Sequence, residues 1–139
     1  GYALDEALRA LRARQVDRAL LVMGGETLAG RAPPGRRGWR VEVEQADAAH
    51  RSLTIANAAV STSGDTEQFV EIDGIRYSHV LDPRTGLGLT HRTAATVLAR
   101  TAMMADAYAT TVTVLDGAAR AGFMARHPEA AFYVRRVEP

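Results

Sequence analysis

Residues 93–115 read TAATVLARTAMMADAYATTVTVL, and this stretch decides the fold. Its first part, Thr93 to Ala99, is a run of small and β-branched residues that predicts a strand. The following residues, Thr101 to Leu115, carry few charges on any helical face, so they predict a helix that is largely buried. A strand followed by a buried helix indicates that helices pack on a sheet.

The part of the chain before this stretch predicts one helix and several strands. From Ala3 to Gln15, apolar residues recur at helical spacing, which indicates a helix packed on the surface of the domain. Ala19 to Met23 is a continuous apolar run that ends at Gly24-Gly25, and we interpret it as a central strand buried on both faces. Further strands are expected at residues 39–43, where apolar and charged residues alternate, and at residues 53–60.

Turn signals and helical patterns divide the rest of the chain. Asp73-Gly74 separates two short strands, residues 69–72 and 75–79, and predicts a β-hairpin. Residues 82–86, DPRTG, predict a second, tighter turn. A helix at residues 118–127 and a strand at 130–134 close the chain. Because helices and mainly antiparallel strands mix without a strict βαβ alternation, we expect an α+β fold in which the sheet is packed with helices.

Length and composition exclude several classes of protein. The 139 residues are enough for one domain with its own core, and neither the 47% hydrophobic content nor the net charge of +1 suits a disordered chain or a nucleic-acid-binding protein. The absence of cysteine excludes disulfides, thiolate metal sites and a cysteine nucleophile. Since no apolar run approaches the roughly 20 residues that span a bilayer, we expect a soluble chain, with any export signal outside it.

The segment around Asp106 is the strongest candidate for a metal site. Asp106 and Thr110 are four residues apart, so their side chains share one face of the predicted helix and can converge on one point. Two hard oxygen ligands at one point suit Mg2+ or Ca2+. The alternative is that the Thr110 hydroxyl bonds back to the carbonyl of residue 106 while Asp106 faces solvent.

Two further polar segments follow strands. His79, at the predicted end of the hairpin, is a group that can titrate or donate a proton near a phosphate, or a structural histidine satisfied by neighbouring backbone. Ser63-Gly64 could place a hydroxyl and bare backbone amides beside a phosphate. Asp82, Pro83 and Gly86 have a structural task in the turn, so their presence alone predicts only a turn.

Taken together and in order, five segments resemble the ApbE family of Mg2+-dependent flavin transferases. These segments are residues 1–5 (GYALD), 23–26 (MGGE), 63–67 (SGDTE), 79–86 (HVLDPRTG) and 105–110 (ADAYAT). The resemblance runs from Gly1 to about Arg135 and implies a T-fold-like α+β architecture. It also implies that residues 1–139 form a single ApbE-like domain from which the N-terminal part of the family's domain is absent, including a lysine expected just before Gly1.

The same resemblance implies roles for individual residues. Asp106 and Thr110 resemble the family's Mg2+ ligands, with the ion against the FAD pyrophosphate. His79 would lie close to the reacting phosphates and is the catalytic candidate, although one of the carboxylates is an equal candidate for the base. Thr66 stands where the family has an aromatic residue. The residues that would belong to the flavin pocket are Asp5, Ser63, Glu67, His79 and Thr85.

The implied reaction is phosphoryl transfer: a threonine of an acceptor protein attacks the FMN-side phosphorus of FAD, and AMP leaves. The partners would be FAD and that acceptor protein, without nucleic acid. The family also implies the bacterial periplasm, or the cell-envelope side of the inner membrane, and membrane contact only through a lipid anchor outside this chain. Three alternatives remain open: an FAD pyrophosphatase that releases FMN and AMP, a flavin-binding or partner-binding module without catalysis, and a purely structural domain.

Overall fold

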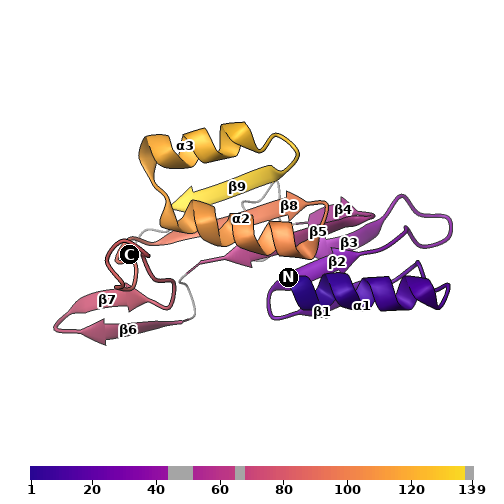
Figure 1. The fold of residues 1–139 in the computed structure, drawn as a ribbon, viewed down its shortest axis with the longest axis horizontal. Coiled ribbons are helices and arrows are strands. Elements are labelled where there is room, and N and C mark those ends of the chain that lie inside the picture. Colours follow the sequence, from indigo (N-terminus) through magenta and orange to yellow (C-terminus); the bar gives the residue numbers. More distant parts are fainter. Residues whose placement is uncertain (44–51, 65–67, 137–139) are drawn as a thin grey trace.

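The computed structural model describes residues 1–43, 52–64 and 68–136, and in them a five-stranded antiparallel sheet forms the centre of the fold. Its strand order is β1-β2-β5-β8-β9, and every neighbouring pair is antiparallel. The class predicted from the sequence, α+β with a mainly antiparallel sheet and packed helices, is therefore confirmed (Figure 1). The strands are β1 (Leu20–Met23), β2 (Glu26–Ala29), β5 (Ala58–Ser63), β8 (Thr93–Ala99) and β9 (Ala131–Arg136).

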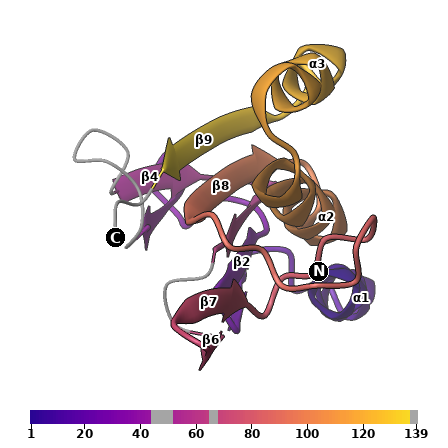
Figure 2. The ribbon, with the colours of Figure 1, turned by 90° about the vertical axis from the view of Figure 1, so that its left-hand side faces the viewer.

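Helices cover one face of this sheet, and the turned view separates them from the strands (Figure 2). The helices are α1 (Tyr2–Ala13), α2 (Ala102–Val114) and α3 (Gly117–Arg126). The core between them and the sheet contains Leu4 and Leu8 of α1, Val97 of β8 and Val112 of α2. Where α2 crosses the sheet, its buried side chains are mostly alanines, so helix and sheet can pack closely. These alanines are Ala102, Ala105 and Ala109.

The opposite face of the sheet is covered by a small two-stranded ribbon, β3 (Trp39–Glu42) paired with β4 (Ser52–Ile55). Val41 and Ile55 of the ribbon pack with Val60 of β5 in a second core cluster. The alternation predicted for this segment is confirmed, because Val41 is buried while its neighbours Arg40 and Glu42 are exposed. The central strands β2, β5 and β8 are therefore largely buried, with the helices on one side of the sheet and the ribbon on the other (Figure 2).

Two predictions about strands are wrong. The apolar run at residues 20–23 forms an edge strand rather than a central one, and Val22 is 67% exposed. Gly24 and Gly25, both at positive φ, turn the chain back into β2, and β2 then lies between β1 and the rest of the sheet. The single strand expected at 53–60 is two strands in different sheets, because the chain breaks at Asn57, which has a φ of 48°.

The hairpin predicted around Asp73-Gly74 is confirmed as β6 (Phe69–Ile72) and β7 (Ile75–Ser78). Both turn residues have positive φ, 51° and 74°, as a type I′ turn requires. The hairpin projects from the end of the sheet (Figure 1). Its base is joined to the next loop, since the Ser78 amide donates to the Leu89 carbonyl at 2.9 Å.

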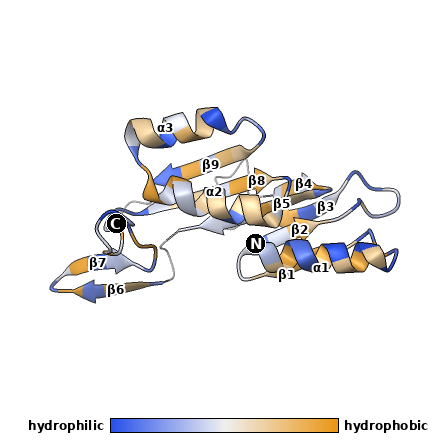
Figure 3. Ribbon diagram, viewed as in Figure 1, coloured by the Kyte–Doolittle hydropathy of each residue, from blue (hydrophilic) through white to orange (hydrophobic). Residues whose placement is uncertain are grey.

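Helices α1 and α2 differ in their hydropathy. Helix α1 has apolar and polar residues on different faces, whereas α2 is apolar over most of its length (Figure 3).

The second turn is also confirmed, because the Gly86 amide donates to the Asp82 carbonyl at 2.8 Å and Gly86 has a φ of 72°. In the part of the chain that the structure describes, no helix is both long enough and apolar enough to cross a bilayer.

Removing the side chain of Leu8 tests the packing of α1 on the sheet. Leu8 is 4% exposed, so Leu8→Ala leaves a cavity and should lower the free energy of unfolding by about 2–5 kcal/mol. The measurement is urea denaturation followed by circular dichroism. Ala7→Ser, at an exposed position of the same helix, should leave the value nearly unchanged. Equal values for the two variants would mean that α1 is not part of the core.

Candidate functional site

The candidate site begins where the first turn of α1 contacts the first turn of α2. The carboxylate of Asp5 accepts hydrogen bonds from the backbone amides of Ala102 and Met103, each at 2.9 Å. The hydroxyl of Thr101 accepts a third, from the Met104 amide at 3.2 Å. Amide groups that have no partner inside the helix are thereby satisfied, and a negative charge lies at the positive end of the helix dipole. Asp5 therefore fixes where α2 starts.

The backbone of Gly1 lies directly against α2. A Cβ atom at Gly1 would be 2.6 Å from the Cα of Met103, a distance that real side chains do not adopt. The amino nitrogen of Gly1 lies 2.6 Å from Glu26 Oε2 and 3.2 Å from Asp106 Oδ2. Carboxylates from β2 and α2 thus meet at the start of α1.

Asp106 and Thr110 lie one turn apart on α2, as predicted. The Asp106 side chain is 46% exposed, and Thr110 is also exposed. The hydroxyls of Thr111 and Thr113 donate to the carbonyls four residues before them, at 2.7 and 2.8 Å. No such bond occupies the Thr110 hydroxyl among the described residues, so the expected alternative of back-bonding is found at its neighbours instead.

These two side chains have the chemistry that Mg2+ requires. A carboxylate and a hydroxyl supply hard oxygen atoms, and their exposure leaves room for water or substrate oxygens to complete the coordination. Within the described ranges, no three His, Asp or Glu side chains are grouped so that they could hold a metal ion. The pair on α2 therefore fits an Mg2+ ion that takes most of its ligands from outside the protein side chains.

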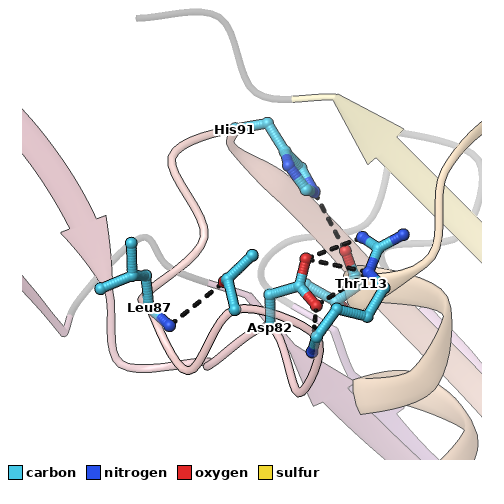
Figure 4. A network of polar contacts seen from close by, with 6 residues as sticks. Asp82, Leu87, His91 and Thr113 are labelled. Atoms are coloured by element: carbon cyan, nitrogen blue, oxygen red, sulfur yellow. Dashed lines mark hydrogen bonds and ion pairs between the residues drawn. The ribbon is translucent and has the colours of Figure 1, made fainter.

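The loop after β7 is ordered by its own polar contacts (Figure 4). The guanidinium of Arg84 pairs with the carboxylate of Asp82 at 2.7 Å, and the Arg84 amide donates to the same carboxylate at 2.9 Å. These side-chain and backbone hydrogen bonds lower the pKa of Asp82 from 3.8 to about 2. Asp82 is therefore ionised at neutral pH and is a weak base. Its task is to hold the turn.

Two more contacts of this loop connect it internally and to α2. The hydroxyl of Thr85 accepts a hydrogen bond from the Leu87 amide at 3.2 Å, within the turn. The Nε2 atom of His91 lies 3.2 Å from the carbonyl of Thr113, near the C-terminal end of α2 (Figure 4). Sequence analysis did not single out His91, and no spacing signal pointed to it. Helix α2 thus carries Asp106 and also contacts the end of this loop.

His79 follows β7 directly and is exposed. Its Nδ1 atom lies 3.1 Å from the carbonyl of Gln68, and its backbone amide donates to the same carbonyl at 3.1 Å. When Nδ1 donates in this contact it carries the ring proton, which leaves Nε2 as the acceptor of the neutral ring. The Nδ1 side of the ring thus has the backbone partner expected of a structural histidine, and among the described residues no hydrogen bond is found at Nε2.

The residues predicted for the flavin pocket lie in different parts of the structure. Asp5 and Asp106 come together at the start of α2, and Ser63 lies at the end of β5, paired with Ala95 of β8. Glu67 lies outside the described residues. The structural task of Asp5 is clear, whereas its membership of a flavin pocket stays a prediction, as it does for Ser63, His79 and Thr85.

The chain is similar in sequence to a known family of proteins. The model described as the ApbE family matches residues 1–134. The FAD:protein FMN transferase of Klebsiella pneumoniae is 36% identical over 121 residues, which cover 83% of this chain and 34% of that protein. The protein of the same name from Vibrio cholerae is 33% identical, with 83% and 36% covered.

Solved structures give the same result for the fold. The flavinyl transferase ApbE of Pseudomonas stutzeri, in its apo form, superposes with a TM-score of 0.82 at 32% identity, over 99% of this chain and 44% of that one. The ApbE protein of Thermotoga maritima superposes with a TM-score of 0.81 at 27% identity, over 99% and 48%. The chain thus spans about a third of the curated relatives and less than half of these solved structures.

Removing the carboxylate of Asp5 tests its role at the start of α2. Asp5→Ala leaves two amide groups of α2 without their partner and should lower the free energy of unfolding by about 1–2 kcal/mol, measured by urea denaturation. Glu6→Ala is the matched control, because the Glu6 carboxylate pairs with exposed Arg9 and should contribute little. A similar loss in both variants would mean that the hydrogen bonds from α2 to Asp5 do not stabilise the fold.

Proposed function

The chain belongs to the ApbE family, and from this membership we propose that it forms the part of an Mg2+-dependent flavin transferase that carries the metal ligands. The complete enzyme would transfer FMN from FAD to a threonine of an acceptor protein and release AMP. The observation that carries the proposal is the pair Asp106 and Thr110, whose half-exposed carboxylate and exposed hydroxyl lie one turn apart on α2. The names of the relatives, which state FAD, FMN and a protein acceptor, support the substrates.

Asp106 and Thr110 would hold the Mg2+ ion. When bound, the ion supplies positive charge that stabilises the negative charge of the FAD pyrophosphate. The chain's own contribution is positional, because both ligands belong to a helix whose start is fixed by Asp5 and whose inner face is buried on the sheet. Since the carboxylate of Asp5 occupies the first amides of α2, these amides are not free to bind a phosphate of the substrate.

We assign the role nearest the reacting phosphates to His79. In the reaction, a bond forms between the threonine oxygen and the FMN-side phosphorus, the bond from that phosphorus to the bridging oxygen breaks, and AMP leaves with that oxygen. The threonine proton needs an acceptor, since a hydroxyl is a weak nucleophile. The Nε2 atom of neutral His79 can take it, because the Gln68 carbonyl engages Nδ1. Asp82 is a poorer acceptor, since its pKa is about 2.

The metal assignment is tested with two variants and a matched control. Asp106→Asn and Thr110→Val should each weaken Mg2+ binding at least tenfold and reduce Mg2+-dependent release of AMP from FAD, in protein that contains the complete family domain. Thr111→Val should leave both unchanged, because the Thr111 hydroxyl bonds back to the Ala107 carbonyl. Mg2+ binding is measured by titration calorimetry and AMP by chromatography. Normal Mg2+ dependence in Asp106→Asn would refute the ligand assignment.

Residues 1–139 alone should fold but not transfer FMN. They supply the core and the proposed side-chain ligands, yet they span 44% of the Pseudomonas stutzeri enzyme, so FAD would be held on one side only. Poor alignment of attacking and leaving oxygens alone can cost several orders of magnitude in rate. The chain is incubated with FAD, Mg2+ and an acceptor protein, and covalent flavin is detected by fluorescence on a denaturing gel.

A labelled acceptor at the rate of a full-length relative would show that residues 1–139 are a complete enzyme. Free FMN and AMP without a labelled acceptor would instead favour the pyrophosphatase alternative. Circular dichroism of the same sample separates a folded, inactive chain from an unfolded one.

A further inference from the structure

The hairpin β6–β7 has two faces of different character. In an antiparallel pair, residues directly opposite each other point to the same side, and side chains alternate along each strand. The pairs Val70–Tyr77 and Ile72–Ile75 therefore share one face, which consists entirely of large apolar or aromatic side chains. We call these four residues the apolar hairpin face.

The other face of the hairpin is polar. Its pairs are Phe69–Ser78 and Glu71–Arg76. The ring of Phe69 is covered by the guanidinium of Arg76, whose central carbon lies 3.8 Å above the ring centre. Phe69 stays 48% exposed and Ser78 is buried, so this face combines one aromatic ring in contact with a cation, a charged pair and a buried hydroxyl.

The apolar hairpin face is exposed in residues 1–139. Val70 is 58% exposed, Ile72 57% and Ile75 47%, although an amphipathic ribbon is stabilised only when its apolar side is covered. A single two-stranded hairpin is marginal in water. This hairpin nevertheless has a fixed base, because Gly88 lies so close to Ser78 that a Cβ there would be 2.4 Å from the Ser78 carbonyl oxygen.

We propose that the apolar hairpin face is a docking surface for the segment of the ApbE fold that residues 1–139 do not span. The solved relatives carry more than half of their length beyond the region matched by this chain, which covers 44% and 48% of them. That polypeptide must pack on the matched part in a single chain. The hairpin offers it an apolar surface that leads directly into His79 and the loop at residues 79–91.

A second copy of the chain is a weaker occupant. A stable interface between separate proteins buries about 800 Å² on each partner and uses roughly 20–30 residues a side. The apolar hairpin face has four side chains, each of them partly covered already. A segment joined in the same chain binds with a high effective concentration, so a surface of this size is sufficient for it. The inference concerns assembly and does not depend on the proposed catalysis.

The absence of cysteine makes a clean labelling experiment possible. Ile75→Cys places one thiol on the apolar hairpin face, and Glu71→Cys places one on the polar face of the same hairpin. Each variant is prepared twice: as residues 1–139 alone, and as a chimera in which these residues replace the matching region of the Pseudomonas stutzeri enzyme. The rate of reaction with a maleimide dye is measured for all four proteins.

Both thiols should react rapidly in residues 1–139 alone. In the chimera, the reaction at Ile75→Cys should slow at least tenfold, and that at Glu71→Cys should change less than threefold. A second chimera with the Thermotoga maritima protein gives the same comparison if the first does not fold. The proposal is overturned if Ile75→Cys stays reactive in a folded chimera, or if both thiols are slowed equally.

The other occupants give distinct results, and each would also overturn the proposal. Protection of Ile75→Cys in residues 1–139 alone, increasing with protein concentration, would identify a second copy. Protection that arises in the chimera only after an acceptor protein is added would identify the acceptor. Since labelling reports on accessibility, an inactive but protected chimera would leave this inference intact and count against the proposed function alone.

Discussion

The candidate site depends on one interaction, the two hydrogen bonds from the backbone of α2 to the carboxylate of Asp5. They join the first helix of the chain to a helix that begins almost a hundred residues later, and Gly1 brings the two backbones into contact at the same place. Both proposed metal ligands lie within the first three turns of α2. Their position relative to the sheet is therefore set by a polar contact at the helix end and by apolar contacts along the helix.

The central strands of the sheet support this helix from a position in which both faces of the sheet are covered. Strand β8 is buried along almost its whole length, with α2 on one side and the ribbon β3–β4 contributing to the core on the other side of the sheet. The loop after β7 is tied to the same helix through His91 and Thr113. One helix thus positions the proposed metal ligands and the loop that follows His79.

Local patterns were sufficient for most of the fold. The strand at Thr93–Ala99 has the predicted bounds, and the Asp73-Gly74 turn is where its dipeptide placed it, because both depend on neighbouring residues. The position of β1 in the sheet depends on which strand pairs with which, and an apolar run of four residues carries no such information. The break at Asn57 was missed for a related reason, since a positive φ at a residue other than glycine has only a weak sequence signal.

In the candidate site too, features set by neighbouring residues were predictable and features set by distant contacts were not. Spacing alone placed Asp106 and Thr110 on one helical turn, but the contacts of Asp5 with α2 cross the whole chain and could not be read from either segment. The role of His91 was missed because a single histidine after a turn has no characteristic pattern. Glu67 lies outside the described residues, so its place in the site stays a prediction.

The alanines of α2 limit how this site can change. Ala105 and Ala109 are completely buried against the sheet and immediately precede Asp106 and Thr110 in the sequence. A larger side chain at either position would have to push the helix away from the sheet, because a close-packed interior has no spare volume. The outward oxygens would move with it. Variation on the buried side of the helix would therefore shift the proposed metal ligands on its outer side, even though the ligands themselves are unchanged.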